Sequence, residues 1–250
     1  MRKHKYLAMF IALAMVITML PLMAIPVFAA DDNDVVPDMN LRTVINTQLK
    51  VSNKSAPISK AQMEKLTDTL DATEKSVESL EGMQYAINVK KLIFTDNQIS
   101  DLSPLAGLTN LLVLGVNKNQ ITNISPLAGL TALKLLDLSE NQISDINLLS
   151  KMLNMQFLDL KGNQISDISF LSGMTNLILL TLEENHINDL SPLSGIRNKS
   201  LVYAKNQSIS VSAYADIIPN PLKAIDGAVV PITKDTNAEN TNDKQIKLLN

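Results

Sequence analysis

The chain has 250 residues, no cysteine, two histidines and a formal net charge of −3 at pH 7. Without cysteine no disulfide can hold the fold, so the chain depends on a hydrophobic core. Its share of hydrophobic residues, 46%, is typical of a globular domain. A mildly acidic chain is poorly suited to bind nucleic acid or an anionic membrane surface, and we expect neither as a partner.

The first residues have the layout of a secretory signal peptide. Three basic residues within 1–6 precede an apolar run over 7–20, and the segment 27–29 offers a cleavage site. We therefore predict a signal peptide over 1–29, cleaved near Ala29, and a secreted, extracellular protein. Cleavage removes three positive charges and changes the formal net charge from −3 to −6.

An uncleaved membrane anchor is the alternative for this segment. Residues 7–30 carry no charge and are long enough to span a bilayer as a helix. Pro21 and Pro26 interrupt the run, and together with the cleavage pattern they favour a signal peptide. After cleavage we expect no membrane-inserted segment.

Residues 30–66 do not repeat, and their pattern predicts helices. Apolar residues recur at helical spacing between Leu41 and Leu49. Ser59, with Gln62 three residues later, fits a capping box at the start of a second helix. Because the end of a stack of repeats exposes apolar core, we predict that 30–66 is a helical N-terminal cap.

Residues 67–209 are built from units of 22 residues. Five units in one register open at Val89, Leu111, Leu133, Met155 and Leu177. Positions 4, 6 and 11 of these units are apolar, and position 9 is always Asn: Asn97, Asn119, Asn141, Asn163 and Asn185. The units at 67–88 and 199–209 are degenerate. This is the leucine-rich-repeat pattern at the short end of its range of periods.

The spacing predicts an α/β repeat, a leucine-rich-repeat solenoid with a concave parallel β-sheet and short convex helices. On a strand, positions 4 and 6 point to one face and positions 3, 5 and 7 to the other. One coil cannot bury its apolar face alone, so the coils must stack. We expect the Asn column to satisfy backbone groups in a bend, a binding site being the alternative. Ser-Pro-Leu, as at 103–105, predicts a helix that Ser caps.

The end of the chain departs from the repeat. Gln207 stands where the other units have Asn, so the last coil has lost its ladder Asn. Apolar extended pieces in 210–232 flank a turn at Asp226-Gly227, and we expect them to fold back over the last coil as a cap. Residues 233–250 are polar and predict a disordered tail.

The unit Asn-Gln-Ile-Ser-Asp-Leu-Ser-Pro-Leu-Ala-Gly-Leu-Thr-Asn, residues 97–110, resembles the repeats of internalins, secreted or surface proteins of Gram-positive bacteria. The cap over 37–49 and the segment 218–231 are similar to the family's helical cap and to the opening of its immunoglobulin-like domain. The resemblance implies that 210–232 is a partial immunoglobulin-like cap. It also implies a virulence protein whose concave face binds a host protein in adhesion, invasion or interference with host signalling.

Two departures from the family distinguish this chain. The immunoglobulin-like segment is shorter than the roughly 80–100 residues that such a sandwich needs. No wall-sorting motif or wall-binding module is present. The chain therefore resembles a short released member, or a truncated one.

Residues that carry catalysis are sparse. There is no cysteine nucleophile and no paired-His metal motif, and His186 stands in a turn position that favours a solvated side chain. The column at position 13 raises the question of calcium, but Asp and Asn favour turns and the spacing of a calcium loop is absent. It consists of Asp101, Asn123, Asp145, Asp167 and Asp189. We expect no enzyme, no metal and no cofactor.

The concave face is the candidate binding site, because position 3 forms an apolar stripe beside charged residues. The candidate partner-binding residues are Val113, Leu135, Phe157, Leu179 and Leu201 in the stripe, with Asp137, Asp159, Thr181, Tyr203, Lys161 and Glu183 beside it. β-propensity alone is the other explanation for the stripe.

We predict a monomer that binds a protein, expected to be a host cell protein. The alternative is a module that recognises cell-wall glycan or helps build the bacterium's own surface. Aromatic stacking platforms would favour glycan, and the concave face has only Phe157 and Tyr203.

Overall fold

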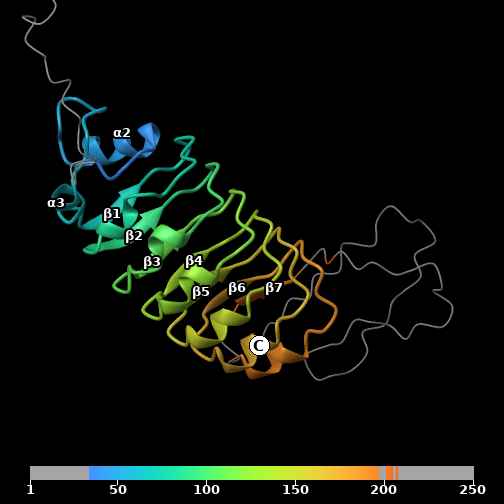
Figure 1. Ribbon diagram of the computed structural model, residues 1–250. Coiled ribbons are helices and arrows are strands. Elements are labelled where there is room, and N and C mark those ends of the chain that lie inside the picture. Colours follow the sequence, from blue (N-terminus) through green and yellow to red (C-terminus); the bar gives the residue numbers. More distant parts are fainter. Residues whose placement is uncertain (1–33, 197–200, 205–206, 208–250) are drawn as a thin grey trace, which may run out of the picture. The chain divides into compact units, whose positions relative to one another are not determined.

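The computed structural model describes residues 34–196, 201–204 and 207, and within them the chain is a leucine-rich-repeat solenoid (Figure 1). One parallel sheet holds the strands in chain order. They are β1 (Asp68–Asp71), β2 (Val89–Ile93), β3 (Val113–Gly115), β4 (Leu135–Asp137), β5 (Phe157–Asp159), β6 (Leu179–Thr181) and β7 (Leu201–Tyr203). The predicted solenoid is confirmed. The predicted signal peptide (1–29), C-terminal cap (210–232) and tail (233–250) lie outside the described residues.

The register of the sheet follows the 22-residue unit. Leu114 pairs with Leu92 on one side and with Leu136 on the other, and each partner occupies position 4 of its own coil. The only irregularity among the described pairs lies between Asp68 and Thr69 at the first strand. Equivalent residues of successive coils therefore lie side by side and form straight rows across the sheet.

The core fills the space behind the sheet. Positions 4 and 6 are buried in every coil from β2 to β6, as the alternation predicted. In the coil that contains β3 these residues are Leu114 and Val116. The residue at position 11, which follows the bend after the strand, is also buried in the core; Ile121 is an example. Each coil therefore buries its apolar residues against its neighbours, which explains why one coil could not fold alone.

The Asn column forms a ladder between coils. In Asn141, Oδ1 accepts a hydrogen bond from the N–H of Ile121 at 3.0 Å, and Nδ2 donates to the carbonyl of Val116 at 3.0 Å, both in the preceding coil. The same Nδ2 also donates to Leu138 and Ser139 in its own bend. The prediction that Asn satisfies backbone groups is confirmed.

The ladder continues into the last described coil although its Asn is missing. Gln207 accepts from the N–H of Ile187 at 3.0 Å and donates to the carbonyl of Leu182 at 2.8 Å. These are the same two links that Asn makes in the other coils. The longer amide side chain of Gln207 therefore replaces the ladder Asn.

The convex side consists of short 3₁₀ helices. They are η1 (Met83–Tyr85), η2 (Ser103–Leu105), η3 (Ser125–Gly129), η4 (Asn147–Lys151), η5 (Ser169–Gly173) and η6 (Ser191–Gly195). The prediction that Ser caps these helices is wrong, because Ser is already the first residue of helices such as η2 and η3 and the residue before it, Leu102 or Ile124, occupies the cap position. Instead, the side chain at position 13 accepts a hydrogen bond from the backbone N–H two residues later. Asp101 Oδ1, for example, accepts from the N–H of Ser103 at 2.8 Å. Hydrogen bonds from the Ser103 side chain and backbone lower the pKa of Asp101.

Two helices lie before the sheet, at the N-terminal end of the solenoid (Figure 1). They are α2 (Met39–Gln48) and α3 (Lys60–Met63), and the capping box of Ser59 and Gln62 is present at α3. Asp38 caps α2 with Oδ1, and its Oδ2 accepts from the N–H groups of Glu78 and Ser79 in the first coil. One carboxylate thus joins α2 to the solenoid.

Candidate functional site

The apolar row at position 3 crosses the concave face as predicted by the spacing. Val113, Leu135, Phe157, Leu179 and Leu201 pair in sequence from β3 to β7. Phe157 exposes 36% of its surface, whereas Val113, Leu135 and Leu179 are half-buried. The row is therefore a shallow apolar band, with Phe157 as its most exposed described member.

The neighbouring row, at position 5, is mixed in chemistry. Asp137 and Asp159 pair across β4 and β5, and Thr181 and Tyr203 continue the row on β6 and β7. Tyr203 exposes 42% of its surface. Gly115 comes before Asp137 in the row and carries no side chain, and Ile93 Cδ1 and Thr95 Oγ1 cover it, at 3.5 and 4.0 Å from where a Cβ would lie.

One lysine lies among the acidic residues of this region. Lys161 Nζ is 3.2 Å from Glu184 Oε1 and 3.9 Å from Glu140 Oε1, so it joins the coils on both sides. Glu183 is half-buried next to this group. The Lys161 ammonium is therefore shared between two glutamates of the adjacent bends.

The two aspartates bond to their own coils. Asp137 Oδ1 accepts from the N–H of Ser139 at 3.0 Å and from its hydroxyl at 2.7 Å, and Asp159 Oδ1 accepts from the N–H of Lys161 at 3.0 Å. Burial raises the pKa of Asp159, and the charges of Asp137 and Glu183 add to the rise. This part of the face thus has a negative potential that the described residues do not fully balance.

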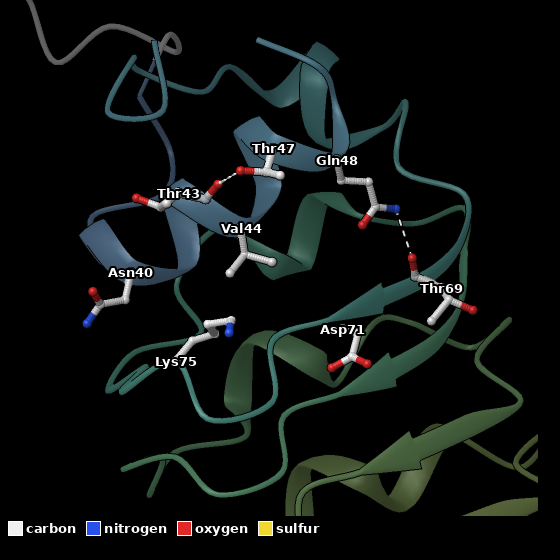
Figure 2. A pocket seen from close by; sticks show the side chains of 8 residues that line it. All are labelled: Asn40, Thr43, Val44, Thr47, Gln48, Thr69, Asp71 and Lys75. Atoms are coloured by element: carbon white, nitrogen blue, oxygen red, sulfur yellow. Dashed lines mark hydrogen bonds between the residues drawn. The ribbon is translucent and has the colours of Figure 1, made fainter. Parts of the chain in front are cut away.

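A pocket lies at the N-terminal end of the same face, where α2 meets β1 (Figure 2). Its volume is about 440 Å³. The lining residues are Asn40, Thr43, Val44, Thr47, Gln48, Thr69, Asp71 and Lys75. Gln48 Nε2 donates to the Thr69 carbonyl at 2.8 Å and closes one side. The sequence reasoning missed this pocket, although the five α2 residues share one helical face and four of them are polar.

Groups for metal or catalytic chemistry are not assembled in the described part of the chain. No group of three or more His, Cys, Asp or Glu within it could hold a metal ion. His186 is exposed, and Asp101, Asn123, Asp145, Asp167 and Asp189 each accept a backbone hydrogen bond in their own turn. No helix within 34–196 is long and apolar enough to cross a membrane.

Comparison with known proteins identifies the family. The family of leucine-rich repeats (two copies) matches residues 87–129, 109–151, 131–173 and 153–195. Internalin C2 of Listeria monocytogenes is 30% identical, with a TM-score of 0.56, over 74% of this chain and 92% of that one. The chain belongs to the internalin-like leucine-rich-repeat proteins. No curated protein gave a significant match.

Other solved structures agree with this placement. An internalin (inlF) of the same bacterium is 27% identical, with a TM-score of 0.60 and coverage of 74% of this chain and 62% of that one. The functional domain of InlJ is 23% identical, with a TM-score of 0.56 over 70% of this chain and 42% of that one, and it shares the fold. The internalin-like chain thus spans less than two thirds of the length of both. Its solenoid has the form of a binding scaffold, which suggests a role in binding protein.

Proposed function

We propose that this internalin-like chain is secreted and binds a host cell protein through its concave face, in adhesion, invasion or interference with host signalling. The observation that carries the proposal is the apolar row next to Asp137 and Asp159. Interaction sites combine an apolar centre with a polar border, and this face has both. The similarity to internalins supports the host partner, and the basic and apolar order of residues 1–20 supports export.

Because most members of the apolar row are half-buried, the residue to be mutated in the test must be chosen with care. Leu135 and Leu179 contact the sheet around them, so their truncation would also cost folding energy. Phe157 is the most exposed described member, and Phe157→Ser removes apolar surface from the centre of the face. Leu153 exposes 51% and lies outside the strands, so Leu153→Ser is the matched control.

The experiment is affinity capture from a host-cell lysate, read by mass spectrometry. We expect proteins that the parent and Leu153→Ser capture and Phe157→Ser does not, with all three melting within a few degrees of one another. Equal capture by all three proteins would refute binding through this face. For export, the N-terminus of the protein in culture medium should begin near Ala30; an intact Met1 in the membrane fraction would refute secretion.

Cell-wall glycan recognition is the second candidate. It is favoured by Phe157 and Tyr203, which are both exposed on the concave side and could stack on sugar rings. Their positions, two coils apart in neighbouring rows, give no continuous platform. Co-sedimentation with purified cell walls decides it: sedimentation that depends on both aromatic rings would favour glycan.

A further inference from the structure

Asp137 and Asp159 are directly opposite each other on β4 and β5. Neighbouring strands lie about 4.8 Å apart, and like charges in opposite positions destabilise a sheet. Each carboxylate uses Oδ1 to accept from its own coil. Among the ion pairs of the described residues, none involves either aspartate. The pair therefore has acceptor capacity and negative charge that the fold leaves unmatched.

Lys161 offsets this charge only in part: its ammonium lowers the pKa of Asp159, yet that pKa remains raised. Lys161 Nζ approaches Glu184 and Glu140 in the bends at either side. Among the described residues, five carboxylates lie on or beside this part of the face: Asp137, Asp159, Glu140, Glu183 and Glu184. The raised pKa of Asp159 agrees with a charge that folding alone disfavours. Groups kept at a cost to stability are typical of functional surfaces.

Apolar side chains flank the pair in the adjacent row. Leu135 and Phe157 stand two residues before Asp137 and Asp159 on the same strands, so they point to the same face. A rise of about 3.3 Å per residue separates the apolar and acidic rows by roughly 7 Å. One short segment of a partner can therefore contact both rows at once.

We propose that the concave face at β4 and β5 docks a partner segment with one basic and one apolar side chain. The basic side chain hydrogen-bonds to both Asp137 and Asp159, and the apolar one packs on Leu135 and Phe157. This inference names the partner's chemistry and rests on the proposed function. Arginine suits the position best, because its planar fork can donate to two carboxylates at once and is weakly hydrated.

The probe is a phage library of random linear peptides, selected on the purified protein. Parallel selections use Asp137→Asn/Asp159→Asn, which keeps the size of both side chains, and the control Glu64→Gln/Glu78→Gln. The control removes two charges from exposed residues outside the strands. The best clone is then synthesised and titrated against each protein by calorimetry at low and high salt.

We expect the parent and the control to enrich clones that carry Arg or Lys next to an apolar residue. Asn at both sites should weaken the chosen peptide at least about tenfold, as expected for loss of a charge-assisted hydrogen bond. Added salt should weaken binding to the parent more than to the double variant. Clones without basic residues, equal affinity for the double variant, or no enrichment would each overturn the inference.

A further variant separates this inference from the proposed function. If the peptide loses affinity with Phe157→Ser but not with the Asn pair, the concave face binds protein and the basic preference is wrong. If it is insensitive to both changes, neither the face nor the basic contact accounts for binding. If the peptide loses affinity both with the Asn pair and with Phe157→Ser, the result supports the proposed function and the basic contact alike.

Discussion

Asn119 Oδ1 accepts a hydrogen bond at 2.9 Å from the backbone N–H of Ile99, which lies 20 residues earlier in the preceding coil. Its Nδ2 donates to the carbonyl of Phe94 in that same coil at 2.9 Å. One side chain therefore satisfies a donor and an acceptor of its neighbour. Because these groups are buried, water cannot replace a bond that is lost, and the cost is greatest at the N–H of Ile99, since the carbonyl of Phe94 also accepts from Asn97.

Asn141→Ala should destabilise the fold strongly. The change leaves the buried N–H of Ile121 without its acceptor. The carbonyls of Val116 and Leu138 each lose one of two donors and keep their bonds to Asn119 and Asn163. With about 1–3 kcal/mol for the unsatisfied N–H and about 0.5–1.5 kcal/mol for each of the two other bonds, we expect a loss of at least about 2 kcal/mol in urea unfolding. Asn123→Ala is the control, because it removes one exposed acceptor bond and should cost roughly 0.5–1.5 kcal/mol. Equal losses would contradict the ladder.

Gln207→Leu should loosen the last described coil. It deletes both bonds of Gln207 to the preceding coil while keeping a side chain of similar size. We expect faster hydrogen exchange at the amide of Ile187, by the factor that corresponds to about 1–3 kcal/mol. Gln164→Leu, at an exposed position of another coil, should leave the exchange of Ile187 unchanged.

Lys118→Gly should stabilise the protein. Position 8 has positive φ in successive coils: Asp96 (57°), Lys118 (52°), Glu140 (53°), Gly162 (66°) and Glu184 (57°). The left-handed conformation costs roughly 1–2 kcal/mol for a residue with a Cβ, and glycine loses about 0.5–1 kcal/mol in chain entropy, so the net gain is about 0.5–1 kcal/mol. Gly162→Ala should shift the midpoint of urea unfolding the other way. A loss on Lys118→Gly would show that its side chain stabilises the bend.

Asp159→Asn should raise stability at neutral pH and not in acid. Burial raises the pKa of Asp159 in the folded state, so folding favours the protonated form, and the ionised form opposes folding above that pKa. The gain should reach up to about 0.5 kcal/mol at pH 7 and vanish below about pH 3.9, where the unfolded carboxyl is protonated too. Thermal melts at both pH values measure it. The same gain at both values would contradict this origin.

The sequence predicted the solenoid well because one chemical rule repeats in every coil. Leu114 and Val116 are buried, and Asn119 bonds across coils, as alternation and amide chemistry required. The capping role predicted for Ser103 was wrong, because a high N-cap propensity does not determine the geometry of the turn. The turn places the carboxylate of Asp101 where the backbone N–H of Ser103 points. The left-handed column at position 8 could not be read from mixed residue types such as Lys118 and Glu140.

The candidate site was harder to predict than the fold. Rows on the concave face follow from the period, so the pairing of Asp137 with Asp159 was implicit in the spacing. How far each side chain is exposed depends on its neighbours in three dimensions, which the period does not contain. The pocket at α2 is lined by residues of the helical segment and by Thr69 and Asp71 of a degenerate coil. Neither segment follows the repeat pattern, so the sequence offered no spacing from which to predict the pocket.

The interlocking of the coils has a consequence for how such a chain can evolve. Each ladder bond joins adjacent coils only, whether it spans 20 or 25 residues. A duplication or deletion of one whole unit between β2 and β6 therefore leaves every remaining donor opposite an acceptor. A single inserted residue within a strand would turn core side chains outward instead. The binding face can thus lengthen or shorten by one strand in a single genetic event, so its reach can follow a changing ligand while the interior stays the same.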